Sequence, residues 1–255
     1  MARNQQYTDF DVSKIAYTKP KKNARGGATV FLNASETDSN NPRLQLEKMR
    51  APFGVREAME AGGRPSLDLA VSSEKLKAFC EQLDENNIKN ATDNSEAWFK
   101  QKMSREVISQ FYRKLVPDPT NPDYDPLLRV KISQREGRQT AVFVIKTDPS
   151  TGKETWDEGT IDDVTENCHV LPIVEIQSLW FVQKQFGCTF VADKLLVWPS
   201  TRGAAAKRDF DFILPGGGVE ASASGKRGRG EEDGKDSGDS KRTKHEDGMG
   251  GEAES

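Results

Sequence analysis

The sequence predicts a mainly β domain with inserted helices, of the α+β class. Short segments in which apolar and polar residues alternate dominate the chain between residues 28 and 215. Two segments with helical periodicity lie within about residues 73–117, between the early and the late strands. Because strands and helices do not take turns along the chain, we predict an antiparallel sheet or small barrel rather than parallel βαβ units.

Three early segments have the alternation of half-buried strands, namely 29–32, 43–49 and 66–71. The Ala51-Pro-Phe-Gly54 sequence ends the second of them sharply. Residues 1–27 are polar, and their five basic residues between Lys14 and Arg25 have no acid among them. We therefore expect residues 1–27 to form a flexible basic arm.

The two helices are predicted from their apolar spacing. A serine at 72 or 73 caps the first, which runs to about Asn87. Its buried stripe follows the i, i+3, i+4, i+7 pattern and consists of Leu76, Phe79, Cys80 and Leu83. The second begins near Ser104, and its predicted apolar face consists of Val107, Ile108, Phe111, Tyr112 and Leu115. A proline-rich loop, with prolines at 117, 119, 122 and 126, ends it.

The late part of the chain returns to strands. The predicted ranges are 127–133, 140–146, 170–183 and 186–198, followed by a short strand with Phe210, Phe212 and Leu214. The 140–146 run is dense in β-branched residues and is expected to be buried on both faces. Seven acids and one lysine lie between residues 147 and 166, around a turn at 148–153.

Composition divides the 255 residues into three parts: an arm at 1–27, a domain at 28–215, and a tail at 216–255. The tail has no aromatic residue and too few apolar ones to offset the entropy of ordering, so we expect it to be disordered. The rest of the chain has thirty basic and thirty acidic residues. A site for a polyanion would therefore depend on local separation of charge.

Several classes of chemistry are not expected. Three scattered cysteines and two histidines do not make a zinc site or a disulfide framework, so we predict no metal and no cofactor. Gly216–Gly218 lacks the lysine of a phosphate-binding loop, and no nucleophile lies in a recognisable motif. We therefore predict that the protein is not an enzyme. With no signal peptide or apolar span, we expect a soluble intracellular protein that is not secreted and has no membrane partner.

The stretch from Leu171 to Trp198 holds five of the twenty aromatic residues, and basic residues flank it. Unpaired bases stack on aromatic rings, and their phosphates need a basic track, so this pattern favours single-stranded nucleic acid. On a half-buried strand, however, alternate aromatics are more commonly core. Residue parity suggests that Phe181 is exposed and Trp180 buried. For the next strand, parity leaves open whether Phe186, Phe190 and Trp198 or Val191, Leu195 and Val197 are exposed.

Several segments also resemble a known family. They are 48–54 (KMRAPFG), 95–99 (SEAWF) with Tyr112 downstream, 128–131 (LRVK) and 176–190. In order and spacing they are similar to the single-stranded-DNA-binding proteins of large nucleocytoplasmic DNA viruses, such as algal and giant viruses, which are related to those of short-tailed phages. The resemblance implies an OB-fold, a five-stranded antiparallel barrel, with Lys131, Trp180, Lys184 and Phe186 on or beside its groove.

We therefore predict binding of single-stranded DNA with little sequence preference, in viral replication, recombination or repair. The predicted nucleic-acid-binding residues are Arg129, Lys131, Trp180, Phe181, Lys184, Phe186, Phe190, Lys194 and Trp198. Two alternatives stay open, a protein docking module of a replication or transcription complex and a single-stranded-RNA-binding protein. Besides DNA, the partners left open are a DNA polymerase, other replication proteins and a second copy of the chain.

The basic residues of the tail are spaced like a two-part nuclear import signal. They are Lys226, Arg227, Lys241, Arg242 and Lys244. The predicted location is accordingly the host nucleus or an intracellular viral replication site.

Overall fold

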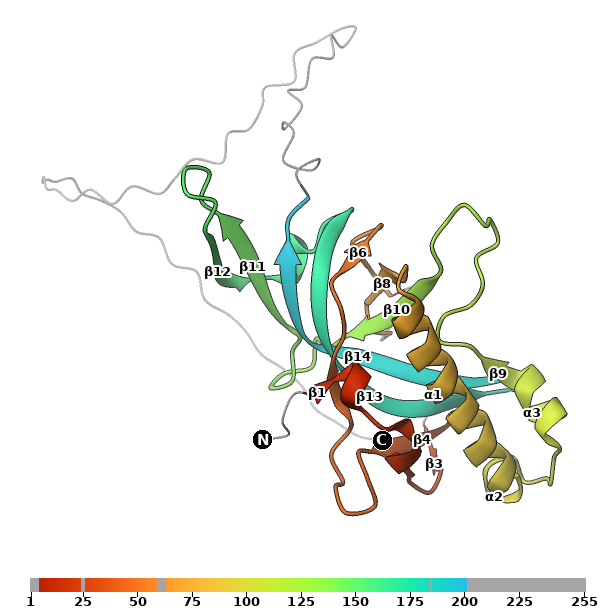
Figure 1. Cartoon of the computed structure of the whole chain (residues 1–255). Helices are drawn as coiled ribbons and strands as arrows, with labels where there is room; N and C mark the ends of the chain where they lie inside the picture. Colours follow the sequence, from red (N-terminus) through yellow and green to blue (C-terminus); the bar gives the residue numbers. More distant parts are fainter. Residues whose placement is uncertain (1–4, 24–25, 59–62, 184, 201–255) are drawn as a thin grey trace, which may run out of the picture. The chain divides into compact units, whose positions relative to one another are not determined.

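The computed structural model describes residues 5–23, 26–58, 63–183 and 185–200 (Figure 1). The strands are β1 (Gln5–Gln6), β2 (Ala16–Tyr17), β3 (Lys21–Lys22), β4 (Ala28–Asn33), β5 (Arg43–Gln45), β6 (Met49–Ala51), β7 (Val55–Arg56), β8 (Ser66–Ala70), β9 (Tyr112–Arg113), β10 (Leu127–Ile132), β11 (Ala141–Thr147), β12 (Glu154–Gly159), β13 (Cys168–Val182) and β14 (Gln185–Trp198). The helices are α1 (Glu74–Asp93), α2 (Ser95–Phe99) and α3 (Arg105–Phe111), with three 3₁₀ turns, η1 (Tyr7–Asp9), η2 (Val12–Lys14) and η3 (Ile161–Asp163). The fold is thus mainly β with few helices, as predicted.

The sheet is mixed, so the prediction of an antiparallel sheet is wrong in part. Strand β14 runs parallel to β9, β10 and β11, and β1 runs parallel to β5. The chain passes through β11, β12 and β13 between β10 and β14, and a connection of that length allows parallel pairing. The pairs β13–β6, β6–β8, β8–β10, β10–β14 and β14–β13 make a closed cycle of five strands.

The core lies between these strands and α1. The Ser73 side chain accepts a hydrogen bond from the Leu76 amide and caps α1, and the predicted stripe is buried. The helix continues to Asp93, beyond the predicted end, and α2 follows almost at once. The second predicted helix is shorter than expected, because Tyr112 begins β9, and Val107 is exposed on it.

The N-terminal segment differs from the flexible arm that the sequence predicts. In the described part, Tyr7 and Ile15 are buried in the core, and β2 and β3 pair with β4. The Tyr17 hydroxyl donates a hydrogen bond to Asn87 of α1. Single apolar residues among polar ones anchor this segment to the core. They are too widely spaced to form a periodic pattern, so the sequence does not predict that the segment packs.

Strands β13 and β14 form a long hairpin, with two register shifts between Ile173 and Val174 and between Ile176 and Ser178. At the first shift the extra residue is Asp193 in β14, and at the second it is Gln177 in β13. The first shift therefore exchanges the inner and outer faces of β14, and the second exchanges those of β13. In β13 the even-numbered residues are buried up to Ser178, and after it Leu179 and Phe181 are buried. The parity prediction for Trp180 and Phe181 is therefore reversed.

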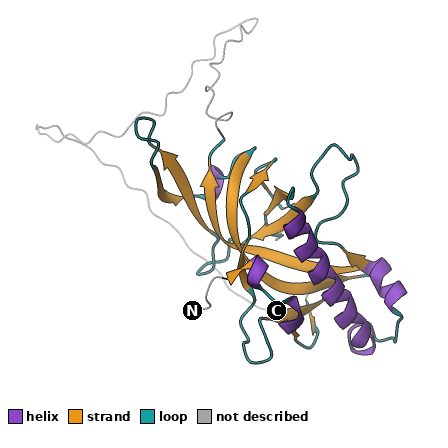
Figure 2. Cartoon of the chain, in the orientation of Figure 1, coloured by secondary structure: helices purple, strands orange, loops and turns teal. Residues whose placement is uncertain are grey.

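Strand β11 also differs from its prediction. Among its seven residues only Val142 is buried, because the α-helices α1, α2 and α3 lie against other parts of the sheet (Figure 2). The helices cover a different part of the sheet, around β9 and the hairpin end of β13 and β14.

Several predictions fall outside the described residues. These are Lys184, the short strand at 210–214, the tail from Gly216 and the five import residues Lys226, Arg227, Lys241, Arg242 and Lys244. Within the described part, none of the helices combines the length and apolar character needed to cross a bilayer.

Candidate nucleic-acid interface

Strand β10 places two of the predicted basic residues side by side. Leu128, Val130 and Ile132 are buried, so the alternation directs Arg129 and Lys131 to the outer face. Arg129 lies opposite Asp68 of β8 and donates two hydrogen bonds to its carboxylate, from Nε at 2.7 Å and Nη2 at 3.0 Å. Asp68 is 1% exposed, and the arginine satisfies its charge and is held in a fixed orientation.

Lys131 lies in a region of positive potential. Burial lowers the pKa of its ammonium group, and the neighbouring Arg129 and Arg64 lower it further. Arg64 itself is held by Gln177, whose side-chain oxygen accepts from both of its terminal nitrogens at 3.1 Å. An anion such as a phosphate beside Lys131 would stabilise its positive charge, which the two arginines disfavour.

Trp180, on β13, lines the same groove as Arg129 and Lys131. Opposite it on β14 is Gly187, where an added Cβ would lie 3.0 Å from the indole. The glycine therefore leaves room for the ring to lie across the neighbouring strand. A groove of about 500 Å³ runs along this surface, and its lining includes Arg113, Lys114, Arg129, Lys131, Trp180 and Thr189. We call it the Trp180 groove.

Two exposed aromatic residues near this surface were not among the predicted site residues. Phe31 lies on β4, opposite Ser178 and thus on the same face as Trp180, and it is 38% exposed with Lys21 over its ring. Alternation in the 29–32 segment, with Val30 and Leu32 inward, is the signal that could have found it. Phe53 is also exposed, and Arg56, which pairs with Asp68 at 3.5 Å, lies over its ring.

Three predicted residues lie in the core instead. Phe181, Phe186 and Phe190 are 8%, 0% and 1% exposed, so their rings are not free to stack with bases. Phe181 and Phe186 stack on each other at 5.3 Å between centroids, and Phe99 contacts both. The expectation that Phe181 is exposed is wrong, because the register shift before Ser178 turns it inward.

The remaining predicted residues are elsewhere. Lys194 and Trp198 belong to a separate cluster at the far end of the β13–β14 hairpin, beside β11 and β12. Lys184 lies outside the described residues. The structure thus brings together Arg129, Lys131 and Trp180 of the predicted set, and the buried Phe190 also belongs to the groove lining.

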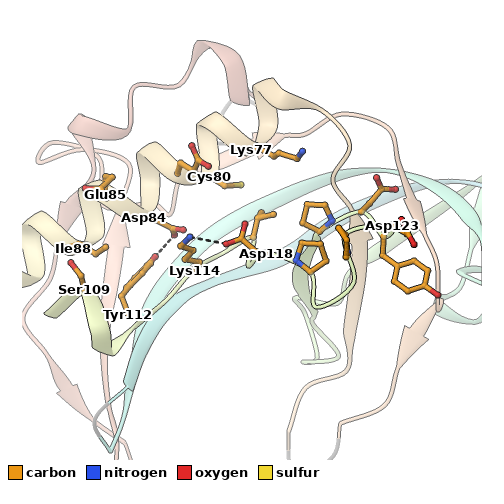
Figure 3. Close-up of a pocket in the computed structure, with 17 residues that line it drawn as sticks. Lys77, Cys80, Asp84, Glu85, Ile88, Ser109, Tyr112, Lys114, Asp118 and Asp123 are labelled. Carbon is orange, nitrogen blue, oxygen red and sulfur yellow. Dashed lines mark hydrogen bonds and ion pairs between the residues drawn. The ribbon is translucent and has the colours of Figure 1, made fainter. Parts of the chain in front are cut away.

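A cavity of about 920 Å³ lies behind the segment 112–115 that carries Arg113 and Lys114 to the Trp180 groove (Figure 3). Six carboxylates and two lysines line it, so it would repel phosphate. Burial raises the pKa of Asp84 to about 7, although hydrogen bonds from the Tyr112 hydroxyl (2.6 Å) and the Leu115 amide stabilise its charge. Burial also raises the pKa of the Cys80 thiol, which disfavours the nucleophilic thiolate.

Comparison with known proteins gives one family. Residues 60–212 match the sequence pattern of a family of unknown function, DUF5871. The chain belongs to this family. No curated protein matches the chain.

Two solved structures of a phage protein are similar to this member of the family. The single-stranded DNA-binding protein from bacteriophage Enc34 in complex with ssDNA has 10% identity and a TM-score of 0.35, over 70% of this chain and 93% of the phage chain. Its C-terminal truncation has 9% identity and a TM-score of 0.36, over 74% and 98% of the two chains.

Proposed function

We propose that the protein binds single-stranded DNA with little sequence preference through the Trp180 groove. The observation that carries the proposal is the indole of Trp180 lying against Gly187 in a groove that it shares with Arg129 and Lys131. A ring of this kind stacks on an unpaired base, at about 1–3 kcal/mol per base, while the cations contact the flanking phosphates.

The other residues of this surface fit the same partner. Arg64, Arg113 and Lys114 add positive charge, and the buried carboxylate of Asp68 is already paired with Arg129 and Arg56. Phe31 with Lys21 supplies a second ring and cation on the same face. Base edges are not needed for stacking, so we expect weak sequence preference.

The proposal includes finer points that the sequence suggested. The closed cycle of five paired strands supports an OB-fold, whose grooves bind single strands. We further propose a non-catalytic role in replication, recombination or repair of viral DNA, in the host nucleus or at an intracellular viral replication site, with replication proteins as further partners.

Fluorescence anisotropy with labelled oligonucleotides tests the proposal. The full chain should bind a dT oligomer more tightly than a duplex of equal length at about 0.1 M salt, where exposed charges are substantially screened. Affinity for dT should fall steeply as salt rises, because neutralised phosphates release counterions. Equal affinity for duplex and single strand would contradict the proposal, and a preference for a matched rU oligomer would favour RNA, which alone offers the 2′-hydroxyl.

A further inference from the structure

A second aromatic surface lies on the outer face of β11, β12 and the adjoining ends of β13 and β14. Six apolar side chains share this face, and we call them the Trp156 patch: Phe143, Ile145, Trp156, Leu171, Leu196 and Trp198. The register places Ile145 opposite Trp156, and both Phe143 and Leu171 opposite Leu196. Phe143 and Trp156 meet edge to face, with 5.3 Å between ring centroids.

The core does not need this face. The neighbouring residues on the inner side of the same strands, Val142, Leu195 and Val197, are buried and complete the core. Trp156 is 60% exposed, and the other five residues of the patch are half-buried. In Figures 1 and 2 the α-helices α1, α2 and α3 lie away from β11 and β12. A contiguous apolar face in water, centred on aromatic rings, is typical of a protein interface.

The charges around the patch have both signs. Lys48 lies over the Trp198 ring at 3.7 Å, and Lys194 over the Phe143 ring at 5.9 Å. Glu154 accepts a hydrogen bond from the Trp198 indole at 3.1 Å, and Glu158 lies opposite Phe143 on the adjacent strand. Carboxylates among the rings would repel phosphates, so this surface suits a protein better than a nucleic acid.

We propose that the Trp156 patch binds the same patch of a second copy of this chain, face to face about a two-fold axis. In such a contact the same surface of both copies forms the interface. A rim with two glutamates and two lysines can then place a glutamate of one copy beside a lysine of the other. Two-fold dimers of this kind are the commonest oligomers, and tryptophan is enriched among the residues that dominate binding energy. The net charge of −3 on 255 residues gives little overall repulsion between copies.

The dimer leaves the Trp180 groove accessible, because none of the groove residues belongs to the patch. Two grooves on one particle would bind one long strand bivalently, which raises the affinity for long oligomers over short ones. This consequence rests on the proposed function, whereas the dimer itself does not.

Light scattering of the full chain over a range of concentrations, without DNA, tests the dimer. We expect the wild-type mass to approach twice that of one chain, and Trp156→Glu to yield folded monomers, since Trp156 is mostly exposed. The melting temperature of the variant should not depend on concentration, whereas that of the dimeric wild type should. Tyr124→Ala is the matched control, because this 69% exposed ring lies outside the patch, and it should dimerise like the wild type.

A second variant tests the rim and does not alter the aromatic rings. Glu154→Lys/Glu158→Lys makes the rim wholly positive, so the two copies should repel each other and dissociation should be strongest at low salt. A monomeric wild type at every concentration, or dimers that persist in both variants, would overturn the proposal. Affinity for a short dT oligomer is expected to change little in Trp156→Glu, and a large loss there with intact dimers would assign the patch to DNA instead.

Discussion

The Trp180 groove and the Trp156 patch contain similar residue types but differ in the charges around the ring. Both place a tryptophan on the outer face of the same sheet, beside lysines. Around Trp180 the free charges are cationic, because Asp68, the carboxylate among the described residues of the groove lining, is buried and paired with two arginines. In the Trp156 patch both signs flank the rings: Lys48 and Glu154 contact Trp198, and Lys194 lies over Phe143. An aromatic residue on a strand therefore does not by itself indicate whether the surface binds DNA or protein. The charges on the neighbouring strands are needed to decide.

The two surfaces also differ in the residues that lie behind them. A change of pH should reveal the largest difference, because a titrating carboxyl lies behind the groove. Asp84 lies behind the segment 112–115 of the groove wall, and burial raises its pKa from 3.8 to about 7 in the folded protein. The neutral carboxyl therefore favours folding below about pH 4, and this stability is lost as pH rises through about 7. By linkage the loss is on the order of 4 kcal/mol.

Denaturant titrations of the wild type and Asp84→Asn at pH 4 to 8 measure this loss. The stability of the wild type relative to the variant should fall across that range, since an asparagine oxygen in the place of Oδ1 can still accept from Tyr112 and, at 3.4 Å, from the Leu115 amide but does not ionise. Dimer dissociation should not follow the same curve. A constant difference between the two proteins would show that Asp84 does not titrate in this window.

Trp180→Ala should have the next largest effect, a loss of DNA affinity without a loss of dimers. Loss of one stacked base costs about 1–3 kcal/mol, which corresponds to roughly 5- to 150-fold weaker binding of a dT oligomer. Anisotropy measures this affinity, and light scattering should show unchanged dimers. Tyr124→Ala again serves as the control for removal of an exposed ring. An unchanged dT affinity with an intact melt would exclude Trp180 as the stacking residue.

Lys131→Ala should have a smaller effect. Its ammonium contributes one phosphate contact, so we expect the slope of log affinity against log salt to decrease by about 1. Lys89→Ala, an exposed lysine on α1, is the matched control. Equal slopes for both variants and the wild type would place the phosphate track elsewhere.

Gly187→Ala should have the smallest effect on the affinity for a dT oligomer. The added Cβ would lie 3.0 Å from the indole and 3.2 Å from the Arg113 carbonyl oxygen, so the ring must shift slightly. We expect a few-fold loss of dT affinity, smaller than in Trp180→Ala, with no effect on dimerisation. A loss as large as in Trp180→Ala would instead indicate a wider rearrangement of β9 and β14, which a melt would detect.

Part of this arrangement could be predicted from the sequence. Alternation located β13 and β14 almost to the residue, and local runs of basic residues pointed to Arg129 and Lys131. The face of Trp180 could not be predicted, because a register shift before Ser178 reverses parity and leaves no sequence signal. The parallel pairing of β10 with β14 is likewise non-local, as is the burial of Asp68, which depends on arginines from two other strands.

The central claim is that Trp180 meets DNA while Trp156 meets a second copy of the chain. Fluorine NMR of 5-fluorotryptophan protein observes all four tryptophans at once, with signals assigned by single Trp→Phe variants. On addition of a short dT oligomer the Trp180 signal should shift and the Trp156 signal should not. On dilution without DNA, Trp156 and Trp198 should shift and Trp180 should not. A Trp156 signal that follows the DNA, or a Trp180 signal that ignores it, would contradict the account.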